Sequence, residues 1–222
     1  MRKIVAILLC ALMLTVPVRA QEEKYVALTF DDGPSGRFTR RLLDGLEKRD
    51  ARATFLLCGY RIQQYPEEAL QIFEDGHEIG IHGYSHDAMC QMSASQIRQE
   101  IRDTAALLPD GCVPVFLRPP GGLCSDAVER AADREGLAIL HWSLDPEDWA
   151  VHSPGEVVRR VLSQVRDGDV ILLHDMSDSS VDAALGIIDE LTARGFQFVT
   201  VSEMARIREL KIVPGKTYRR ME

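Results

Sequence analysis

The sequence lacks several features that would point to particular classes of protein. No two of its cysteines have the Cys-x-x-Cys spacing of a structural zinc cluster. Beyond residue 20 it has no apolar run long enough to cross a membrane, and no linker, internal repeat or low-complexity segment. It also lacks a basic excess, since 26 Lys and Arg stand against 34 Asp and Glu. We therefore expect one acidic domain that binds neither nucleic acid nor an anionic membrane surface.

The first twenty residues predict export. Arg2 and Lys3 precede the almost wholly apolar residues 4–16, and Val18-Arg19-Ala20 supplies a small-residue cleavage site. An uncleaved N-terminal anchor is the alternative, although the run is short for a membrane span. Cleavage removes three basic side chains and no acid, which changes the formal charge from −8 to −11. We expect residues 1–20 to be a signal peptide and residues 21–222 to be a secreted or cell-envelope domain and a monomer.

Four cysteines remain after this cleavage, and an even number permits disulfides in an exported protein. They are Cys58, Cys90, Cys112 and Cys124. Their pairing is left open, except that Cys58 follows an apolar strand and is expected to be a buried thiol.

The rest of the chain alternates apolar strands with amphipathic helices, which indicates a parallel α/β sheet. A helix pattern opens at Ser93 with Gln96 three residues later, a capping box, and another opens at Ser153-Pro154. Residues 211–222 are predicted to be a loose tail. Seven strands suit a (β/α)₇ barrel, with a doubly wound open sheet as the alternative. The predicted strands are Val26–Phe30, Ala53–Leu57, His77–Ile81, Pro114–Leu117, Ala138–Trp142, Asp169–Leu173 and Phe196–Thr200.

Two of these strands end in residues that suit a metal ion. Asp31 and Asp32 follow the first strand, and His82 and His86 follow the third. Two imidazoles four residues apart can meet one cation, and a carboxylate completes a three-ligand face with an open position for water. Taken alone, each pattern is also that of a helix cap or of solvated histidines.

Three further strands end in charged or aromatic clusters. Arg118-Pro119-Pro120 holds an arginine stiffly enough to clamp a carboxylate, although a surface arginine is the alternative. The stretch from Asp145 to Trp149 is either functional or an acidic turn. His174-Asp175 follows a very apolar strand, which favours a functional histidine. We expect Asp31 and His174 to lie on opposite sides of the barrel mouth.

Taken in order, these clusters resemble the five motifs of the polysaccharide deacetylases, carbohydrate esterase family four, whose domain is called NodB-like. The matching stretches are Thr29–Pro34, His82–His86, Arg118–Gly122, Asp145–Trp149 and Leu172–Asp175. The resemblance covers essentially the whole chain after residue 20. It implies a distorted (β/α)₇ barrel and metal-dependent removal of acetyl groups, usually N-acetyl, from a glycan such as peptidoglycan, chitin or an exopolysaccharide.

The resemblance also implies a role for each residue. Asp32, His82 and His86 look like ligands of a divalent metal, usually zinc, with cobalt as a possible substitute. Asp31 looks like the general base and Arg118 like the residue that orients it. His174 looks like the general acid that protonates the leaving amine, and Asp148 like the carboxylate that holds it. Substrate-binding roles fall on three residues, namely Gly121 through its N–H, and Trp149 and Leu172 as apolar walls.

Two positions depart from the family pattern. Gly83 stands where the family usually has Ser or Thr, whose side chain commonly steadies the metal loop. Gly121 stands where the family usually has Tyr. If residue 121 has a negative φ, we expect a more open groove that tolerates lactyl or peptide substituents. Two rival functions are an inactive sugar-binding domain on the same scaffold and a metal-dependent amidase acting on a small amide.

Overall fold

The computed structural model describes residues 23–222, so the predicted signal, residues 1–20, lies outside the described residues. In these residues strands and helices alternate from β1 to β8, with two α-helices, α2 and α3, between β2 and β3. The strands are β1 (Lys24–Asp31), β2 (Ala53–Leu57), β3 (Glu78–Ile81), β4 (Phe116–Leu117), β5 (Ala138–Leu140), β6 (Val170–His174), β7 (Phe196–Phe198) and β8 (Thr217–Tyr218). The α-helices are α1 (Arg37–Glu47), α2 (Gly59–Gln64), α3 (Pro66–Glu74), α4 (Ala94–Ala105), α5 (Asp126–Arg134), α6 (Pro154–Leu162), α7 (Asp178–Ala193) and α8 (Val201–Ile207). Two short 3-10 helices are η1 (Met89–Gln91) and η2 (Pro120–Gly122).

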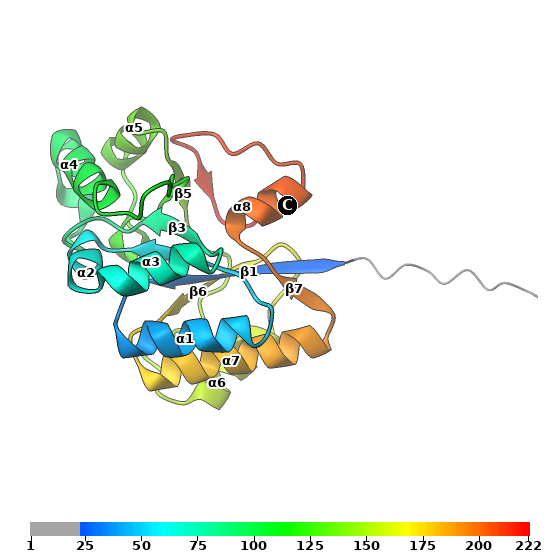
Figure 1. The fold of residues 1–222 in the computed structure, drawn as a ribbon. Helices are drawn as coiled ribbons and strands as arrows, with labels where there is room; N and C mark the ends of the chain where they lie inside the picture. Colours follow the sequence, from blue (N-terminus) through cyan, green and yellow to red (C-terminus); the bar gives the residue numbers. More distant parts are fainter. Residues whose placement is uncertain (1–22) are drawn as a thin grey trace, which may run out of the picture.

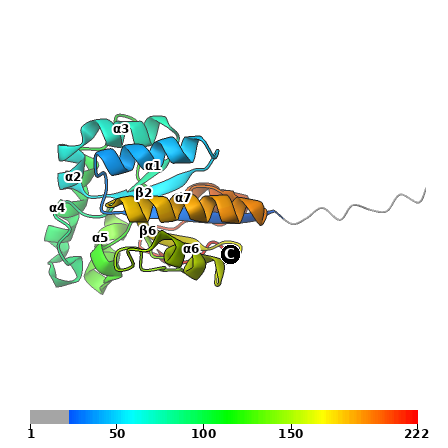
Figure 2. The ribbon, with the colours of Figure 1, turned by 90° about the horizontal axis from the view of Figure 1, so that it is seen from below.

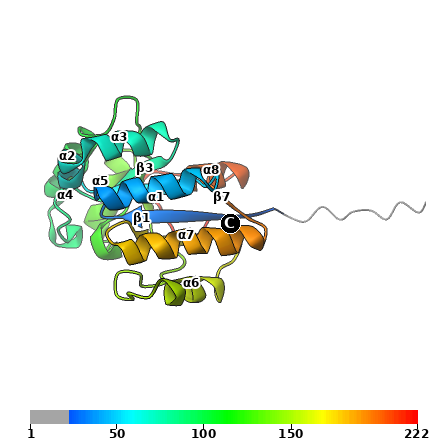
Figure 3. The ribbon, with the colours of Figure 1, turned by 60° about the horizontal axis from the view of Figure 1, so that its bottom comes forward.

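The strands form one curled parallel sheet surrounded by helices. The strand order is β6-β1-β2-β3-β4-β5-β8, and β7 pairs with β1. β1 pairs with three strands, β2, β6 and β7. Its residues Val26, Ala27, Leu28 and Phe30 are completely buried, as expected for a strand covered on both faces. Helices surround this sheet (Figure 1), and α1, α7 and α6 pack side by side along one flank (Figure 2, Figure 3).

The curled sheet confirms the predicted barrel class and excludes the open sheet. A parallel bridge between Leu144 and Ile171 joins the segment after β5 to β6, so the two ends of the sheet approach each other. All seven predicted strands are present, although β4, β5 and β7 are each two residues shorter than predicted. The Ser93 capping box is also confirmed, and α6 begins at Pro154 as predicted, although the Ser153 side chain makes no capping hydrogen bond.

The prediction of a loose tail is wrong. Residues 217–218 form β8, which pairs with β5, and Met221 is completely buried. Arg220 Nε donates a hydrogen bond of 2.8 Å to Asp169 Oδ1, and an antiparallel bridge joins the same two residues. The tail therefore fills the gap between β5 and β6. Its anchors are single side chains spaced irregularly, so the segment has no periodicity by which the sequence could indicate burial.

Two other sequence predictions concern cysteines and membrane segments. Cys58 is a buried thiol as predicted, and it, Cys90, Cys112 and Cys124 are all free. Within residues 23–222, no helix has both the length and the apolar character needed to cross a membrane.

Candidate active site

The candidate residues gather where the parallel strands end. Asp31 and His174 are the last residues of β1 and β6, and they are register partners in that pair of strands. The prediction that they lie on opposite sides of the mouth is therefore wrong. Their strands are first and sixth in the sequence but neighbours in the sheet, because β1 lies between β2 and β6. His82 and Arg118 directly follow β3 and β4 at the same edge.

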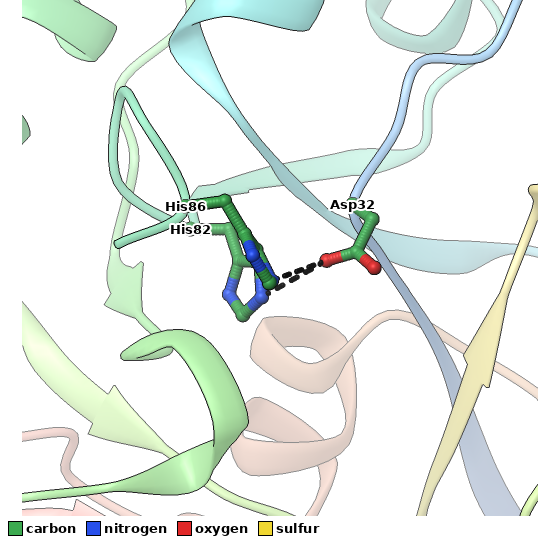
Figure 4. Close-up of side chains that lie close together, drawn as sticks. All are labelled: Asp32, His82 and His86. Atoms are coloured by element: carbon green, nitrogen blue, oxygen red, sulfur yellow. Dashed lines mark ion pairs between the residues drawn. The ribbon is translucent and has the colours of Figure 1, made fainter. Parts of the chain in front are cut away.

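The three predicted metal ligands lie together. One ligand atom from each of Asp32, His82 and His86 lies within 4.8 Å of the others. Asp32 Oδ1 is 3.3 Å from His82 Nε2 and 2.9 Å from His86 Nε2 (Figure 4). That oxygen is buried but accepts no well-aligned hydrogen bond. An unsatisfied carboxylate oxygen facing two imidazole nitrogens fits a divalent cation, for which all three residue types are ordinary ligands.

The ring of His82 is fixed in the form that a metal requires. Its Nδ1 lies 2.7 Å from the carbonyl oxygen of Arg118, and since a carbonyl only accepts, Nδ1 carries the proton. Nε2 is then the unprotonated nitrogen that faces Asp32. A second hydrogen bond of this kind commonly orients histidine ligands in metal proteins.

Two of the three candidate ligands, Asp32 and His86, have a strained backbone. Asp32 has a φ of 70° and His86 a φ of 67°, in the left-handed region that few residues other than glycine adopt. Strain of this kind persists where the surroundings hold it, and it is frequent at ligand sites.

The pKa shifts of the candidate ligands agree with their close approach. Burial raises the pKa of Asp32, but the two imidazoles beside it outweigh burial and hold that pKa well below its usual range. The nearby carboxylate of Asp32 raises the pKa of His86.

Asp31 has a different environment from its neighbour. Its Oδ1 accepts a hydrogen bond of 2.6 Å from Arg118 Nη1, while Oδ2 is 3.8 Å from His82 Nε2. Arg118 is completely buried, so the alternative of a surface arginine is wrong. The guanidinium donates three further hydrogen bonds: from Nη1 to Thr29 Oγ1, from Nε to the Leu140 carbonyl and from Nη2 to the His141 carbonyl. Arg118 thus orients Asp31 with its side chain and His82 with its carbonyl.

His174 is held by Asp148 through both carboxylate oxygens. Asp148 Oδ1 is 2.8 Å from His174 Nδ1, and Oδ2 accepts the His174 backbone N–H at 2.9 Å. Burial alone would lower the pKa of His174. The hydrogen bond and charge of Asp148, with smaller contributions from Asp31 and Asp32, instead raise it to about 9. This raised pKa keeps the imidazole of His174 protonated at neutral pH.

The three candidate metal ligands line one cleft of about 510 Å³ together with Asp31, Asp148 and His174. Arg118 is not part of the lining. Leu172 forms a buried part of its wall, and Trp149 lines it while remaining 62% exposed. The cleft also contains five side chains that the sequence analysis missed: Trp142, His152, Met176, Ser177 and Ser180. Trp142 lies just beyond the end of β5 and is the last residue of a predicted strand, so its position at a strand end could have identified it. His152 and Met176 are isolated loop residues, and no motif or strand end marks them in the sequence.

Gly121 lines the cleft as predicted, but the assumption about its backbone is wrong. Its φ is 65°, a left-handed conformation that strains any residue with a side chain. The nearest atom to a Cβ at this position would be Leu123 Cγ at 3.9 Å. A side chain would therefore find space, but it would strain the left-handed backbone. Replacing Gly121 by Tyr would change the loop as well as add a ring, so it does not isolate an effect on substrate selection.

Comparison with known proteins supports the resemblance to the polysaccharide deacetylases. A family model described as polysaccharide deacetylase matches residues 19–140. Peptidoglycan-N-acetylmuramic acid deacetylase PdaC of Bacillus subtilis is 38% identical over 84% of this chain, which spans only 40% of that relative's length. A peptidoglycan-N-acetylglucosamine deacetylase of Bacillus cereus is 37% identical over 84% of this chain and 90% of its own length.

Solved structures agree with the fold. A family 4 acetyl xylan esterase from Clostridium thermocellum, in complex with a cobalt ion, is 35% identical. It superposes with a TM-score of 0.83 over 89% of this chain and 98% of its own. The fold and the clustered residues define the NodB-like class of carbohydrate esterase family four. The chain belongs to the polysaccharide deacetylase family.

Proposed function

We propose that this protein is a zinc-dependent N-deacetylase that acts, as a monomer, on N-acetylglucosamine residues of an N-acetylated glycan, with peptidoglycan as the natural polymer. One observation carries the proposal: the ligand cluster of Asp32, His82 and His86 shares a cleft with two proton-transfer groups, Asp31 and His174. A family member without catalytic function would have no need to keep both of these groups positioned.

The residues divide the work of amide hydrolysis among them. When bound, a divalent cation lowers the pKa of water and polarises a carbonyl oxygen. Asp31 Oδ2 takes the proton from the attacking water, while Arg118 holds Oδ1. His174 gives its proton to the leaving nitrogen as the C–N bond breaks, which yields acetate and a free amine. Asp148 keeps the imidazole oriented for this donation. Leu172, Trp149 and Trp142 provide apolar surface for the acetyl methyl.

The charge of the cleft favours a neutral sugar. Its lining residues include Asp31, Asp32, Asp145 and Asp148, and none of them is Lys or Arg. An N-acetylmuramic acid with a free lactyl carboxylate would find no Lys or Arg there to pair with, because the bound cation and the protonated His174 are engaged by the acetamide, whereas N-acetylglucosamine carries no charge. This argues against the wide tolerance of lactyl groups expected from Gly121. Of the two relatives described above, the one from Bacillus subtilis is named for N-acetylmuramic acid and the one from Bacillus cereus for N-acetylglucosamine.

Acetate and amine release from four substrates tests this function. The purified domain with zinc should release acetate from chitotetraose and peptidoglycan, and much less from O-acetylated xylan. A small cyclic amide serves as the amidase substrate, and its exclusive hydrolysis would favour the amidase. Zinc binding without any turnover would favour a sugar-binding domain.

The sugar preference has a separate test. A muramic acid oligosaccharide should be a poor substrate with its lactyl carboxylate free and a better one after methyl esterification, because the ester removes only the charge. Equal kcat/KM values for the acid and the ester would contradict the electrostatic argument.

We also propose that the domain works outside the cytoplasm after export. Support comes from the basic start, apolar run and small residues of positions 1–20. N-terminal sequencing of the exported protein should begin at Gln21 or within a residue or two. An intact Met1 in the membrane fraction would instead favour a retained anchor.

A further inference from the structure

The loop between the two histidine ligands is held by a carboxylate from another element. Glu100, in α4, places Oε2 where it accepts three hydrogen bonds from this loop. The donors are the backbone N–H of Tyr84 at 2.7 Å, the backbone N–H of Ser85 at 2.8 Å and Ser85 Oγ at 3.1 Å. A single carboxylate oxygen thus accepts hydrogen bonds from two consecutive peptide N–H groups between His82 and His86.

The absence of a side chain at residue 83 makes room for this contact. A Cβ at Gly83 would lie 3.3 Å from Glu100 Oε2 and 2.8 Å from Met89 Cε. Gly83 also has a φ of 88°, which a side chain would strain. The hydroxyl residue that the family usually has at this position would therefore compete with the carboxylate for the same space.

The opposite side of the loop is also fixed. At the start of α2, the backbone N–H of Gly59 donates to the Gly83 carbonyl at 2.9 Å and that of Tyr60 donates to the Tyr84 carbonyl at 3.1 Å. These are first-turn N–H groups, which have no partner within their own helix. The loop is thus held through its carbonyls by α2 and through its N–H groups by Glu100.

Glu100 belongs to a helix that is fixed at its start and along one face. α4 is capped at its N-terminus by the Ser93 capping box, and it buries Ile97 and Ile101 in the core. Thr104 Oγ1 donates to the Glu100 carbonyl at 2.9 Å. The position of the carboxylate is therefore set by a packed helix and not by the loop that it binds.

We propose that Glu100 is a positioning residue for the metal centre, and that its carboxylate sets the spacing of His82 and His86 in place of the missing side chain at residue 83. The proposal rests on the proposed function, since it requires that these histidines bind a metal. Glu100 does not line the cleft and touches no reacting atom. Its effect should appear in metal affinity and in the mobility of the loop.

The test compares Glu100→Ala and Glu100→Gln with a control, Asp103→Asn. Asp103 is exposed on the same helix, and within residues 23–222 its one side-chain partner is Gln99. Zinc affinity is measured by competition with a chromogenic chelator, and amide hydrogen exchange is measured in the metal-free proteins. Loss of a group that orients a ligand typically weakens metal affinity by about 10–100-fold. We expect that loss for Glu100→Ala, a smaller loss for Glu100→Gln, which keeps an acceptor oxygen, and none for Asp103→Asn.

Exchange of the Tyr84 and Ser85 amides should quicken in both Glu100 variants while the strands stay protected. If Glu100→Ala does not fold, Glu100→Gln decides alone, because it retains the shape of the side chain. Wild-type zinc affinity together with unchanged exchange at residues 84 and 85 would overturn the proposal and leave the proposed function intact. A wild-type protein that binds no zinc would overturn the proposed function as well, whatever the exchange shows.

Discussion

Asp31 and Asp32 are neighbours in the sequence, yet their carboxylates have opposite surroundings. Asp31 accepts a hydrogen bond from a completely buried arginine, whereas Asp32 Oδ1 is buried without a well-aligned hydrogen bond. We call Asp31, Arg118, Asp148 and His174 the proton-transfer half, and Asp32, His82 and His86 the metal half. In the first, protein partners fix each reacting group before substrate arrives. In the second, a polar atom is left for a cation to satisfy.

This difference implies different consequences of mutation. A change in the proton-transfer half removes a buried partner and leaves a charge unpaired, so it should affect folding or the chemical step. A change in the metal half removes a ligand from a site that the apoprotein leaves incomplete, so it should affect metal affinity far more than folding.

The largest effect is expected from Arg118→Met. This change removes four hydrogen bonds from the guanidinium and leaves Asp31 buried without its partner. Breaking a buried ion pair costs roughly 3–5 kcal/mol, so the free energy of unfolding should fall by about that amount and activity should be lost. Urea denaturation measures the first and acetate release the second. A variant as stable as the wild type would show that Arg118 does not hold the proton-transfer half together.

Asp31→Asn and His174→Ala should damage catalysis while sparing the metal. Each removes one proton-transfer group, which is worth roughly 10²–10⁴ in kcat. Neither residue belongs to the metal half, so zinc content should stay at the wild-type level. Steady-state kinetics give kcat for the wild type and the two variants, and metal analysis of the same samples gives their zinc content. Near-normal turnover of His174→Ala would mean that the general acid lies elsewhere.

Asp148→Asn should shift the pH profile of kcat. The pKa of His174 is about 9, and it must be protonated to act, so activity falls as the pH rises through that value. A bound divalent cation would offset the contributions of Asp31 and Asp32 but not the hydrogen bond of Asp148. Without the Asp148 charge, the basic limb should therefore move to lower pH. A basic limb at the same pH in both proteins would assign it to another group.

The smallest effect should come from outside the site, at the tail. Arg220→Met removes one partner of Asp169, which keeps hydrogen bonds from Ser143 Oγ and the Arg166 N–H. Losing the two hydrogen bonds that the Arg220 guanidinium donates to Asp169 should lower the free energy of unfolding by roughly 1–3 kcal/mol. The matched control is Arg219→Met, an exposed neighbour, which should stay within about 0.5 kcal/mol of the wild type. Equal stability of the two variants would show that the tail does not support the sheet.

The sequence predicted the groups that stand at strand ends, because apolar runs locate strands and parallel strands end at one edge. It did not predict that Asp31 and His174 are neighbours, because strand order in a sheet is a long-range property. It also missed β8 and the left-handed φ of Gly121, which depend on contacts made by single residues. Glu100 was missed for a further reason: within an amphipathic helix, a glutamate has the pattern of a solvated surface residue.

The most direct test of the central claim is a zinc titration of metal-free protein, scored by acetate release from chitotetraose. The account predicts no activity after chelation and full recovery at one zinc per chain. His86→Ala should fold like the wild type but fail to recover at that stoichiometry, because it lacks one of the three ligands. Full activity of wild-type protein shown by elemental analysis to be free of metal would contradict the account.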